Sequence, residues 1–292
     1  MKTAKRILLG GLVGLTLGTP AFATPVYGIT DANTLVVFDS GGPGTISSTV
    51  GITGLATGQS LVGIDFRPAN GVLYGVSSDS RLYSIDRSTG LATAIGAAGA
   101  FTLSGTSFGL DFNPTVDRIR LTSNDDQNLR LNPNNGALAA TDTALAFAAG
   151  DANSGTNPTL VGSAYTNSFA GATTTTLFGI DSALDILVSQ IPPNAGALNT
   201  IGSLGFNTTD QVGFDIFAFG NQAFASLTAA GGGSSLFSIN LSTGAATQIG
   251  AIGGGLQITD IAVQQVPEPG TIGLMAAGLL GMVASRRQRR VK

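Results

Sequence analysis

Residues 73–96 read LYGVSSDSRLYSIDRSTGLATAIG, and this stretch decides the fold. It contains a short strand around Tyr74-Gly75-Val76, a turn, a second strand that ends at Asp86, and a hairpin closed by Gly90. In such a hairpin the short polar side chain accepts backbone amide hydrogen bonds, and glycine supplies the positive φ of the bulge. The stretch therefore predicts successive antiparallel strands.

The same unit recurs along the chain. Residues 236–250, LFSINLSTGAATQIG, repeat its second half almost residue for residue, and weaker copies fill the remainder. The five copies begin at Tyr27, Leu73, Ile119, Leu177 and Ala223, which gives separations of 46, 46, 58 and 46 residues. A regular period of this length is typical of repeat folds. The single long interval predicts one insertion, within residues 150–176.

One further strand precedes each copy except the first. These strands lie at residues 62–66, 108–112, 160–165 and 212–216, and a fifth, at 258–263, stands alone after the last copy. A closed ring explains why the first copy lacks this strand and why an extra strand follows the last copy. The extra strand completes the first sheet and removes its open edge. We therefore predict an all-β, five-bladed β-propeller with four-stranded blades over residues 24–265. A β-helix is the alternative, but its shorter coils leave the lone strand unexplained.

The N-terminal residues predict a signal peptide. Lys2, Lys5 and Arg6 precede an apolar stretch at residues 7–17, and small residues end at Ala23. This order is typical of a signal helix removed by signal peptidase, here over residues 1–23. An uncleaved anchor is the alternative, but the apolar stretch is short for a membrane span of about 20 residues.

The C-terminal residues combine VPEPG at 266–270, an uncharged apolar run at 271–285 and an arginine cluster. The run predicts a hydrophobic helix that crosses one bilayer, extended by the aliphatic stems of the arginines. Its basic side stays cytoplasmic, so residues 24–265 face outward. A plain membrane anchor behind a proline-stiffened stalk is one interpretation.

This arrangement resembles the PEP-CTERM sorting signal of Gram-negative bacteria that make exopolysaccharide. The resemblance covers residues 266–292. It implies export across the inner membrane, transient anchoring there, processing by exosortase, and delivery to the cell surface or the exterior. The residues implied are the sorting motif Pro267, Glu268 and Pro269, and the basic stop Arg286, Arg287, Arg289 and Arg290.

The composition of residues 24–265 excludes several classes of function. Six arginines, no lysine and sixteen aspartates give a net charge of 6 − 16 = −10, which disfavours nucleic-acid binding. Histidine and cysteine are absent from the whole chain. This excludes disulfides, thiolate chemistry, Ser-His nucleophile pairs and imidazole ligands. Any enzyme here would use carboxylates, tyrosine, arginine or a hard metal ion.

Aspartates recur in the strand predicted to be innermost. Asp65, Asp111, Asp215 and Asp260 share one repeat position, which Ser163 occupies in the fourth blade. Side chains that face the axis would converge as hard oxygen ligands for calcium or magnesium. Alternatively, each aspartate accepts backbone amides between blades. Without a cation or donors, close carboxylates raise one another's pKa.

Two oxygen-rich loops are expected to be ordinary solvated loops. They are NDDQN at residues 124–128 and DANSGTN at 151–157, and the second lacks the glutamate of an EF-hand. Arg118, Arg120 and Arg130 lie close to the first loop in the sequence, and neutralisation of its aspartates by these arginines is an alternative. Of the four tyrosines, Tyr27, Tyr74, Tyr83 and Tyr165, at least two are expected to pack between blades.

The repeated GIDF, GLDF and GFDI segments, together with YSIDRSTG and FSINLSTG, resemble a family of secreted bacterial proteins known only as a domain of unknown function. That resemblance implies an architecture and a location but no reaction. We expect a non-enzymatic extracellular or surface propeller associated with the matrix, which binds exopolysaccharide through loops. One alternative is a carboxylate- or Ca/Mg-dependent enzyme acting on glycans or lactones. Another is a purely structural matrix component with a hydrated acidic surface.

Overall fold

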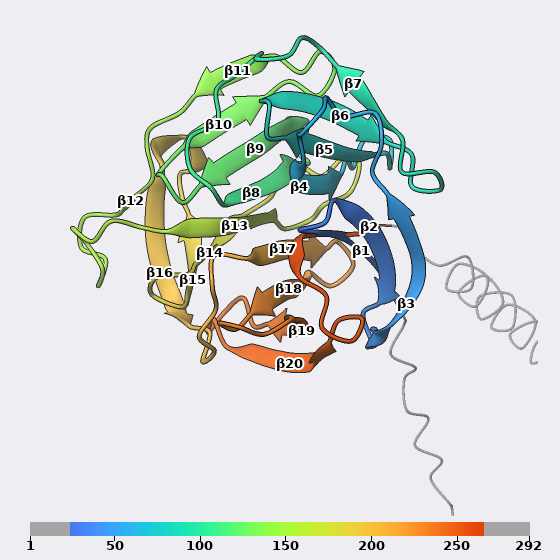
Figure 1. Cartoon of the computed structure of the whole chain (residues 1–292). Coiled ribbons are helices and arrows are strands. Elements are labelled where there is room, and N and C mark those ends of the chain that lie inside the picture. The colour runs from blue at the N-terminus through green and yellow to red at the C-terminus, as the bar shows by residue number, and fades with distance from the viewer. Residues whose placement is uncertain (1–23, 266–292) are drawn as a thin grey trace, which may run out of the picture.

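The computed structural model describes residues 24–265, which form five β-sheets arranged around one axis (Figure 1). This confirms the predicted five-bladed propeller. Within these residues no helix is long and apolar enough to span a bilayer. The predicted signal helix and C-terminal hydrophobic helix lie outside the described residues.

Each blade contributes one strand to an inner ring and extends outward from it. Blade 1 contains, from the axis outward, β21 (Ile258–Val263), β1 (Pro25–Thr30), β2 (Thr34–Asp39) and β3 (Gly42–Gly51). Blade 2 contains β4 (Leu61–Phe66), β5 (Leu73–Ser77), β6 (Arg81–Ile85) and β7 (Ala92–Ile95). Blade 3 contains β8 (Phe108–Asn113), β9 (Arg118–Ser123), β10 (Asn128–Leu131) and β11 (Leu138–Thr141). Blade 4 contains β13 (Leu160–Tyr165), β14 (Leu177–Asp181), β15 (Ile186–Gln190), β16 (Ala197–Ser203) and the outermost β12 (Ala146–Phe147). Blade 5 contains β17 (Val212–Phe217), β18 (Gln222–Thr228), β19 (Ser234–Ile239) and β20 (Ala246–Ala251).

The ring closes as the lone C-terminal strand predicts. Strand β21 pairs antiparallel with β1, so that Tyr27 lies opposite Ala262 and Val26 opposite Val263. In Figure 1 the orange end of the chain lies beside the blue β1. The two ends of the body are therefore tied together by main-chain hydrogen bonds, and neither leaves the inner ring open.

Blade 4 differs from the prediction of four strands. The two-residue strand β12 adds to its outer edge, parallel to β16. It lies just before the predicted insertion at residues 150–176, whose Asp151 binds β16: Asp151 Oδ2 accepts the amide of Thr200 at 2.6 Å, and Oδ1 accepts the Thr200 hydroxyl at 2.8 Å. Strand β12 covers β16, which would otherwise be an edge strand with unpaired backbone groups.

The predicted hairpin turns are confirmed. Asp86 Oδ1 accepts the amide of Ser88 at 2.8 Å, and Asn132 and Asn240 make the same contact two residues ahead, at 3.0 and 2.9 Å. The glycine that ends the first of these turns, Gly90, has a φ of 73°. These side chains are turn formers, because their oxygens replace backbone carbonyls as local acceptors.

Neighbouring blades pack through apolar side chains. Tyr27 of blade 1 meets Phe66 of blade 2 edge to face with ring centroids 5.2 Å apart, and Tyr74 of blade 2 meets Phe112 of blade 3 in the same way at 5.3 Å. Edge-to-face pairs add stability beyond the area they bury. Two tyrosines thus pack between blades, as predicted.

Small residues let the inner strands approach one another closely. A Cβ on Gly109 would lie 2.6 Å from the amide nitrogen of Ser163 in the next blade, and one on Gly213 would lie 2.7 Å from Asp260 Cα. No larger side chain fits at either position without moving a backbone. The absence of side chains at these glycines therefore allows the inner strands of neighbouring blades to pack closely around the axis.

Candidate functional site

Three carboxylates converge at the axis. Asp65 on β4, Asp111 on β8 and Asp215 on β17 each place an oxygen within 4.8 Å of the others. Their residues are 2%, 1% and 2% exposed. Within residues 24–265 this is the one group of acidic side chains close enough to share a metal ion. The structure therefore brings together three of the four aspartates that the sequence singled out.

Asp260 does not share the repeat position of the other three. Asp215 Oδ2 accepts the amide of Val263, just as Asp65 Oδ2 accepts the amide of Phe112, the residue after Asp111. The position that matches Asp111 in β21 is therefore Ala262, and Asp260 lies two residues earlier, where the other blades have glycine. The prediction that Asp260 occupies the same repeat position as the other three aspartates is wrong, because aligning the strands on aspartate alone disregards their register.

In blade 4 the matching residue is Ala164. It lies opposite Phe178 on β14, as Asp65 lies opposite Tyr74 on β5. Ser163 comes one residue earlier on the strand, so the prediction that Ser163 occupies the aspartate position in blade 4 is also wrong. The inner ring thus carries aspartate at this level in three blades and alanine in two.

The axial aspartates tie blades together. Asp65 Oδ1 accepts the amide of Phe66 at 2.6 Å, and Oδ2 accepts that of Phe112 in the next blade at 2.8 Å. Asp215 does the same with Ile216 and Val263, at 2.6 and 2.5 Å. These amides lie on the inner edge of the sheets, where no further strand can pair with them. The interpretation of the aspartates as acceptors between blades is confirmed here.

Asp260 makes equivalent bonds from its shifted position. Its oxygens accept the amides of Ile261 at 2.9 Å and of Ile64 in blade 2 at 2.8 Å. It therefore links blade 1 to blade 2, although it stays outside the group of three.

Asp111 has no such partner. Neither of its carboxylate oxygens accepts a hydrogen bond of normal geometry from the described residues. The nearby amide of Tyr165 lowers its pKa only slightly against a larger opposing effect of burial. An enclosed carboxylate without a donor is costly unless it is neutralised. Asp111 is thus the member of the cluster that backbone hydrogen bonding does not explain.

Burial is the main cause of perturbed titration at the axis. It raises the pKa of Asp65, Asp111 and Asp260 well above the ordinary value, and repulsion from the neighbouring carboxylates adds to this. Burial also raises the pKa of Asp215 to about 7. The salt bridges among the described residues engage Asp117 and Asp142, not these four. Either protons or a cation must therefore balance the cluster.

The axial aspartates lie outside the cavity at the start of the inner strands. A cavity of about 400 Å³ opens where the inner strands begin, lined by residues that include Leu61, Phe108, Val212 and Thr259. None of the axial aspartates lines it. Because the strands pack tightly at their glycines below this mouth, the carboxylates lie beyond the reach of a sugar chain.

Arg118, Arg120 and Arg130 form no salt bridge with the aspartates of the acidic loop at residues 124–128. Arg120 and Arg130, directly opposite each other on β9 and β10, both pair with Asp142, at 2.6 and 2.7 Å. Burial alone would raise the pKa of Asp142, but hydrogen bonds from these two arginines outweigh it and hold the pKa below its ordinary value. With Arg118 they line a second cavity of about 400 Å³. The alternative that these arginines neutralise the aspartates of loop 124–128 is wrong, because the acidic partner of Arg120 and Arg130 is Asp142.

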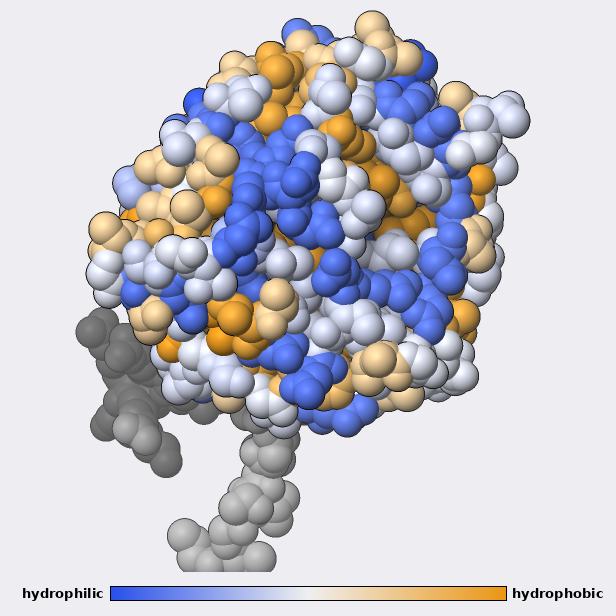
Figure 2. All heavy atoms as spheres, turned by 60° about the vertical axis from the view of Figure 1, so that its left-hand side comes forward, coloured by the Kyte–Doolittle hydropathy of each residue, from blue (hydrophilic) through white to orange (hydrophobic). Residues whose placement is uncertain are grey.

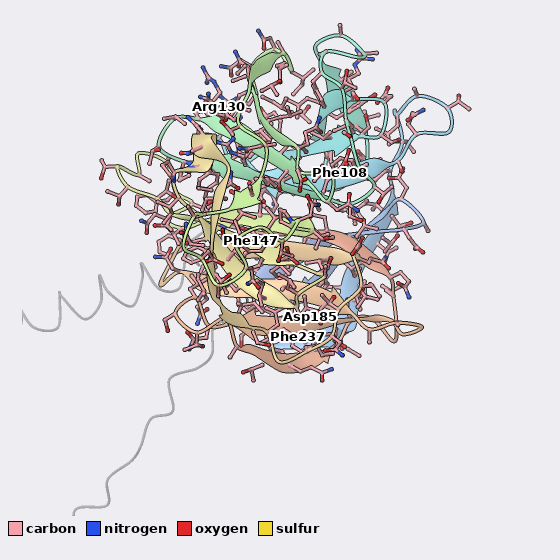
Figure 3. All side chains as sticks on the ribbon, turned by 90° about the vertical axis from the view of Figure 1, so that its left-hand side faces the viewer. Phe108, Arg130, Phe147, Asp185 and Phe237 are labelled. Atoms are coloured by element: carbon pink, nitrogen blue, oxygen red, sulfur yellow. The ribbon has the colours of Figure 1, made fainter. Side chains whose placement is uncertain are left out.

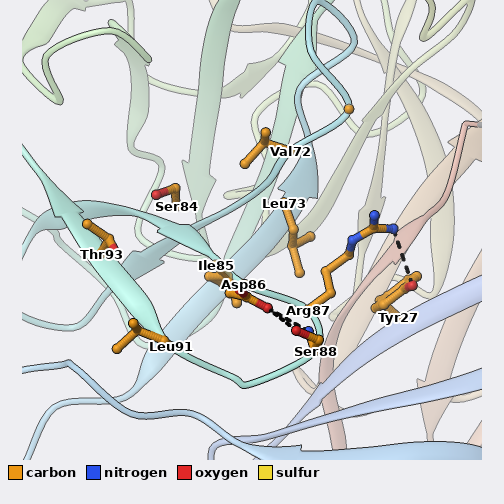
Figure 4. A pocket seen from close by; sticks show the side chains of 11 residues that line it. Tyr27, Val72, Leu73, Ser84, Ile85, Asp86, Arg87, Ser88, Leu91 and Thr93 are labelled. Carbon is orange, nitrogen blue, oxygen red and sulfur yellow. Dashed lines mark hydrogen bonds between the residues drawn. The ribbon is translucent and has the colours of Figure 1, made fainter.

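A larger open hollow of about 710 Å³ lies between blades 1 and 2, lined in part by Tyr27, Asp86 and Arg87 (Figure 4). The Arg87 guanidinium lies over the Tyr27 ring, 5.5 Å from its centroid, and donates to the Tyr27 hydroxyl at 3.3 Å. Asp86 is occupied by its own turn. Since Arg87 covers one face of the Tyr27 ring and this ring also packs against Phe66, the hollow offers no free aromatic platform for a sugar.

Two family profiles match the chain. The family described as "Domain of unknown function (DUF4394)" matches residues 34–262. The family described as "PEP-CTERM protein-sorting motif" matches residues 265–290, which include the predicted motif Pro267, Glu268 and Pro269 and the arginines of the basic stop. Those residues lie outside the described part of the structure. No curated protein is significantly similar to the chain.

Similarity to solved structures is remote. "Dihydro-heme d1 dehydrogenase NirN in complex with DHE" matches at 11% identity and a TM-score of 0.38, over 80% of this chain and 44% of that one. PorZ, described as an essential surface component of the type-IX secretion system of Porphyromonas gingivalis, matches at 12% identity and a TM-score of 0.39, over 78% and 28%. The chain spans less than half the length of either protein.

The match to the sorting motif implies that exosortase processes the chain and that the chain is exported. The body match covers most of the described propeller. The chain therefore belongs to the DUF4394 family, a domain of unknown function, and carries a PEP-CTERM protein-sorting motif at its C-terminal end.

Proposed function

We propose that this protein is a non-enzymatic binding propeller of the Gram-negative cell surface or extracellular matrix, and that its ligand is exopolysaccharide. Signal peptidase removes residues 1–23, the apolar run at 271–285 holds the chain in the inner membrane, and exosortase then cuts near Pro267, Glu268 and Pro269. The match to the sorting motif supports this route.

The enclosure of the axial carboxylates carries the proposal. In a chain without histidine or cysteine, carboxylates are the residues on which glycan hydrolysis would depend. That chemistry needs two carboxyl groups open to the sugar, one on each side of the bond that breaks. Asp65, Asp111 and Asp215 are at most 2% exposed. The enzymatic alternative therefore lacks an accessible site at the axis, whereas the open cavities offer polar surfaces for binding.

We further propose that the axial cluster holds one calcium ion with a structural role. Calcium binds oxygen ligands at about 2.3–2.6 Å, so oxygens up to about 5 Å apart can share it. The spacing within 4.8 Å of Asp65, Asp111 and Asp215 fits that limit, and magnesium requires a tighter set, within about 4.2 Å. The ion would neutralise the carboxylates, supply the missing partner of Asp111 and link blades 2, 3 and 5.

A binding experiment tests the proposed function. Residues 24–265 are titrated with exopolysaccharide purified from the source bacterium, in calcium and in EDTA, and the mixture is assayed for new reducing ends. We expect saturable binding without release of sugar. No binding under any condition would leave only an inert matrix role and reject the proposal.

An enzymatic result is equally recognisable. Sugar release that Asp215→Asn abolishes and the surface control Asp31→Asn preserves would establish catalysis at the axis. The control is matched in chemistry, because Asp31 is an exposed aspartate in a turn and is not a member of the axial cluster.

A further inference from the structure

Half of the body's arginines line one cavity. Residues 24–265 contain six arginines against sixteen aspartates, yet Arg118, Arg120 and Arg130 meet in the cavity of about 400 Å³ between blades 3 and 4. Its volume lies within the range of about 300–1,000 Å³ typical of small-molecule sites. Figure 3 places Arg130 near the edge of the molecule, and Figure 2 shows hydrophilic side chains gathered in patches on the side that carries β12 and β16.

Arg120 is held rigidly at the base of this cavity. It is 2% exposed. Its Nη1 donates to Asn128 Oδ1 at 2.7 Å and to Asp142 Oδ2 at 2.6 Å, and its Nη2 donates to Asn194 Oδ1 at 2.7 Å. Nε lies 3.4 Å from the Tyr165 hydroxyl. Such a fixed guanidinium pre-organises the site, so that little conformational freedom is lost when a ligand binds.

The arginines outnumber their carboxylate partners. Arg130 grips Asp142 with two parallel bonds, Nε to Oδ2 at 2.7 Å and Nη2 to Oδ1 at 2.8 Å. Arg118 donates only to the carbonyl oxygens of Val116 and Asp117, at 3.5 and 2.8 Å. The Asp117 carboxylate is itself paired with Arg67. The cavity thus holds three guanidinium groups and one carboxylate, Asp142, which pairs with two of them, and this leaves a charge of about +2 in a body whose net charge is −10.

Donors remain available on two of the three arginines. Among the described residues, Arg118 Nε and Nη2 and Arg130 Nη1 donate to no acceptor within hydrogen-bond distance. Forked guanidinium donors match the two oxygens of a carboxylate. The side chains of Asn113 and Asn194 and the rings of Pro192 and Pro193 complete the lining. Amides suit sugar hydroxyls, and proline rings supply an apolar wall for a sugar ring.

We propose that this pocket binds a uronic acid residue of an anionic polysaccharide, with the sugar carboxylate between Arg118 and Arg130. The inference rests on the proposed function and narrows it, because it names the chemical class of the ligand and the part of the propeller that takes it. The acidic remainder of the surface repels such a polymer, so binding is directed to this cavity.

The probe is a trigalacturonate, compared with the same trisaccharide after its carboxyl groups have been reduced. Both are titrated calorimetrically into residues 24–265 in calcium-free buffer, and inorganic phosphate and sulfate are titrated in parallel. We expect the acidic trisaccharide to bind at least about tenfold more tightly than its reduced form, with affinity that falls as salt screens the charges. Equal binding of the two trisaccharides, or tighter binding of free phosphate or sulfate, would overturn the proposal.

Variants locate the site. Arg118→Gln leaves the three hydrogen bonds that Arg120 and Arg130 donate to Asp142 intact, because Arg118 pairs only with backbone carbonyls, so it is not expected to affect folding. We expect it to weaken trigalacturonate binding about tenfold, the effect of one lost charged contact of about 1.4 kcal/mol. The matched control is Arg81→Gln in blade 2, whose guanidinium likewise donates only to a backbone oxygen, that of Gly96. Equal loss in both variants, or none in Arg118→Gln, would refute the assignment.

Failure of the pocket assignment can be distinguished from failure of the proposed function. If exopolysaccharide binds saturably but Arg118→Gln and Arg130→Gln bind it as the unaltered protein does, the pocket assignment is wrong and the function stands. If exopolysaccharide does not bind at all, the function itself fails.

Discussion

In the cation-free protein, the stability of the propeller is predicted to fall as the pH rises from about 4 to about 7. Burial raises the pKa of Asp215 to about 7, against an ordinary value of 3.8 in the unfolded chain. Between these two values the folded state keeps a proton that the unfolded state has released, so raising the pH favours unfolding. Burial shifts the pKa of Asp65, Asp111 and Asp260 in the same direction.

The size of the effect follows from Asp215. A difference of about 3 pKa units corresponds to about 4 kcal/mol, at about 1.36 kcal/mol per unit. This contribution is fully present below pH 4 and is lost once the pH exceeds about 7. In a domain of about 240 residues, 1 kcal/mol moves the Tm by about 2–4 °C, so the expected fall is about 8–16 °C.

The assay is thermal unfolding followed by circular dichroism. Residues 24–265 are unfolded in denaturant with EDTA, refolded without cations, and melted at pH values from 4.5 to 8. Parallel samples contain calcium, which binds the deprotonated carboxylates and is expected to restore the lost stability at high pH and to change little at low pH.

Comparison with Asp215→Asn isolates the contribution of Asp215 from that of the other axial aspartates. We expect this variant to lose the part of the pH dependence that comes from Asp215, and Asp31→Asn to keep all of it. A Tm that is independent of pH in EDTA, or the same slope in Asp215→Asn as in the unaltered protein, would refute the reasoning.

Three further predictions concern the axis, the ring and the tail. Asp111→Asn removes a calcium ligand and is expected to abolish most of the calcium-dependent rise in Tm, whereas Asp31→Asn retains it; an unchanged rise would exclude Asp111 as a ligand. Gly213→Ala places a Cβ 2.7 Å from Asp260 Cα and is expected to cost about 1–3 kcal/mol in denaturant unfolding, while Gly232→Ala, with no atom nearer than 3.4 Å, should be close to neutral. Replacement of Pro267, Glu268 and Pro269 by alanine is expected to block exosortase processing, so that immunoblots of the source bacterium show a protein that keeps its C-terminal segment; normal cleavage would exclude these residues from recognition.

The ring was predictable because its determinants are local. Each blade repeats the same strand and turn pattern, and the Asp86 and Asn240 turns need only the side chains within five residues of them. Closure of the ring was predictable from the number of strands in each copy, because the first blade lacked one strand and residues 258–263 supplied one extra strand. Strand β12 was not predictable, because its two residues show no alternation and their pairing depends on the path of the insertion.

The axial site was only partly predictable. Sequence identified the aspartates, but Asp260 stands where the other inner strands carry Gly63, Gly109, Gly162 and Gly213, two residues before the position of the other aspartates. Only the register of the sheets reveals this shift.

The arginine pocket was hidden for a different reason. Arg120 and Arg130 are ten residues apart and face the same side of neighbouring strands, but their partner Asp142 lies in the connection after β11, and Asn194 comes from blade 4. The repeat pattern does not specify contacts between these connecting segments and a neighbouring blade.

Anomalous X-ray diffraction from crystals of residues 24–265 grown in calcium tests most directly whether the axial carboxylates enclose a cation instead of meeting a substrate. We expect a single anomalous peak bound by Asp65, Asp111 and Asp215, with no solvent path from the axis to the surface. Carboxyl groups hydrogen-bonded to one another without a peak, or a soaked oligosaccharide in contact with Asp215, would contradict this expectation.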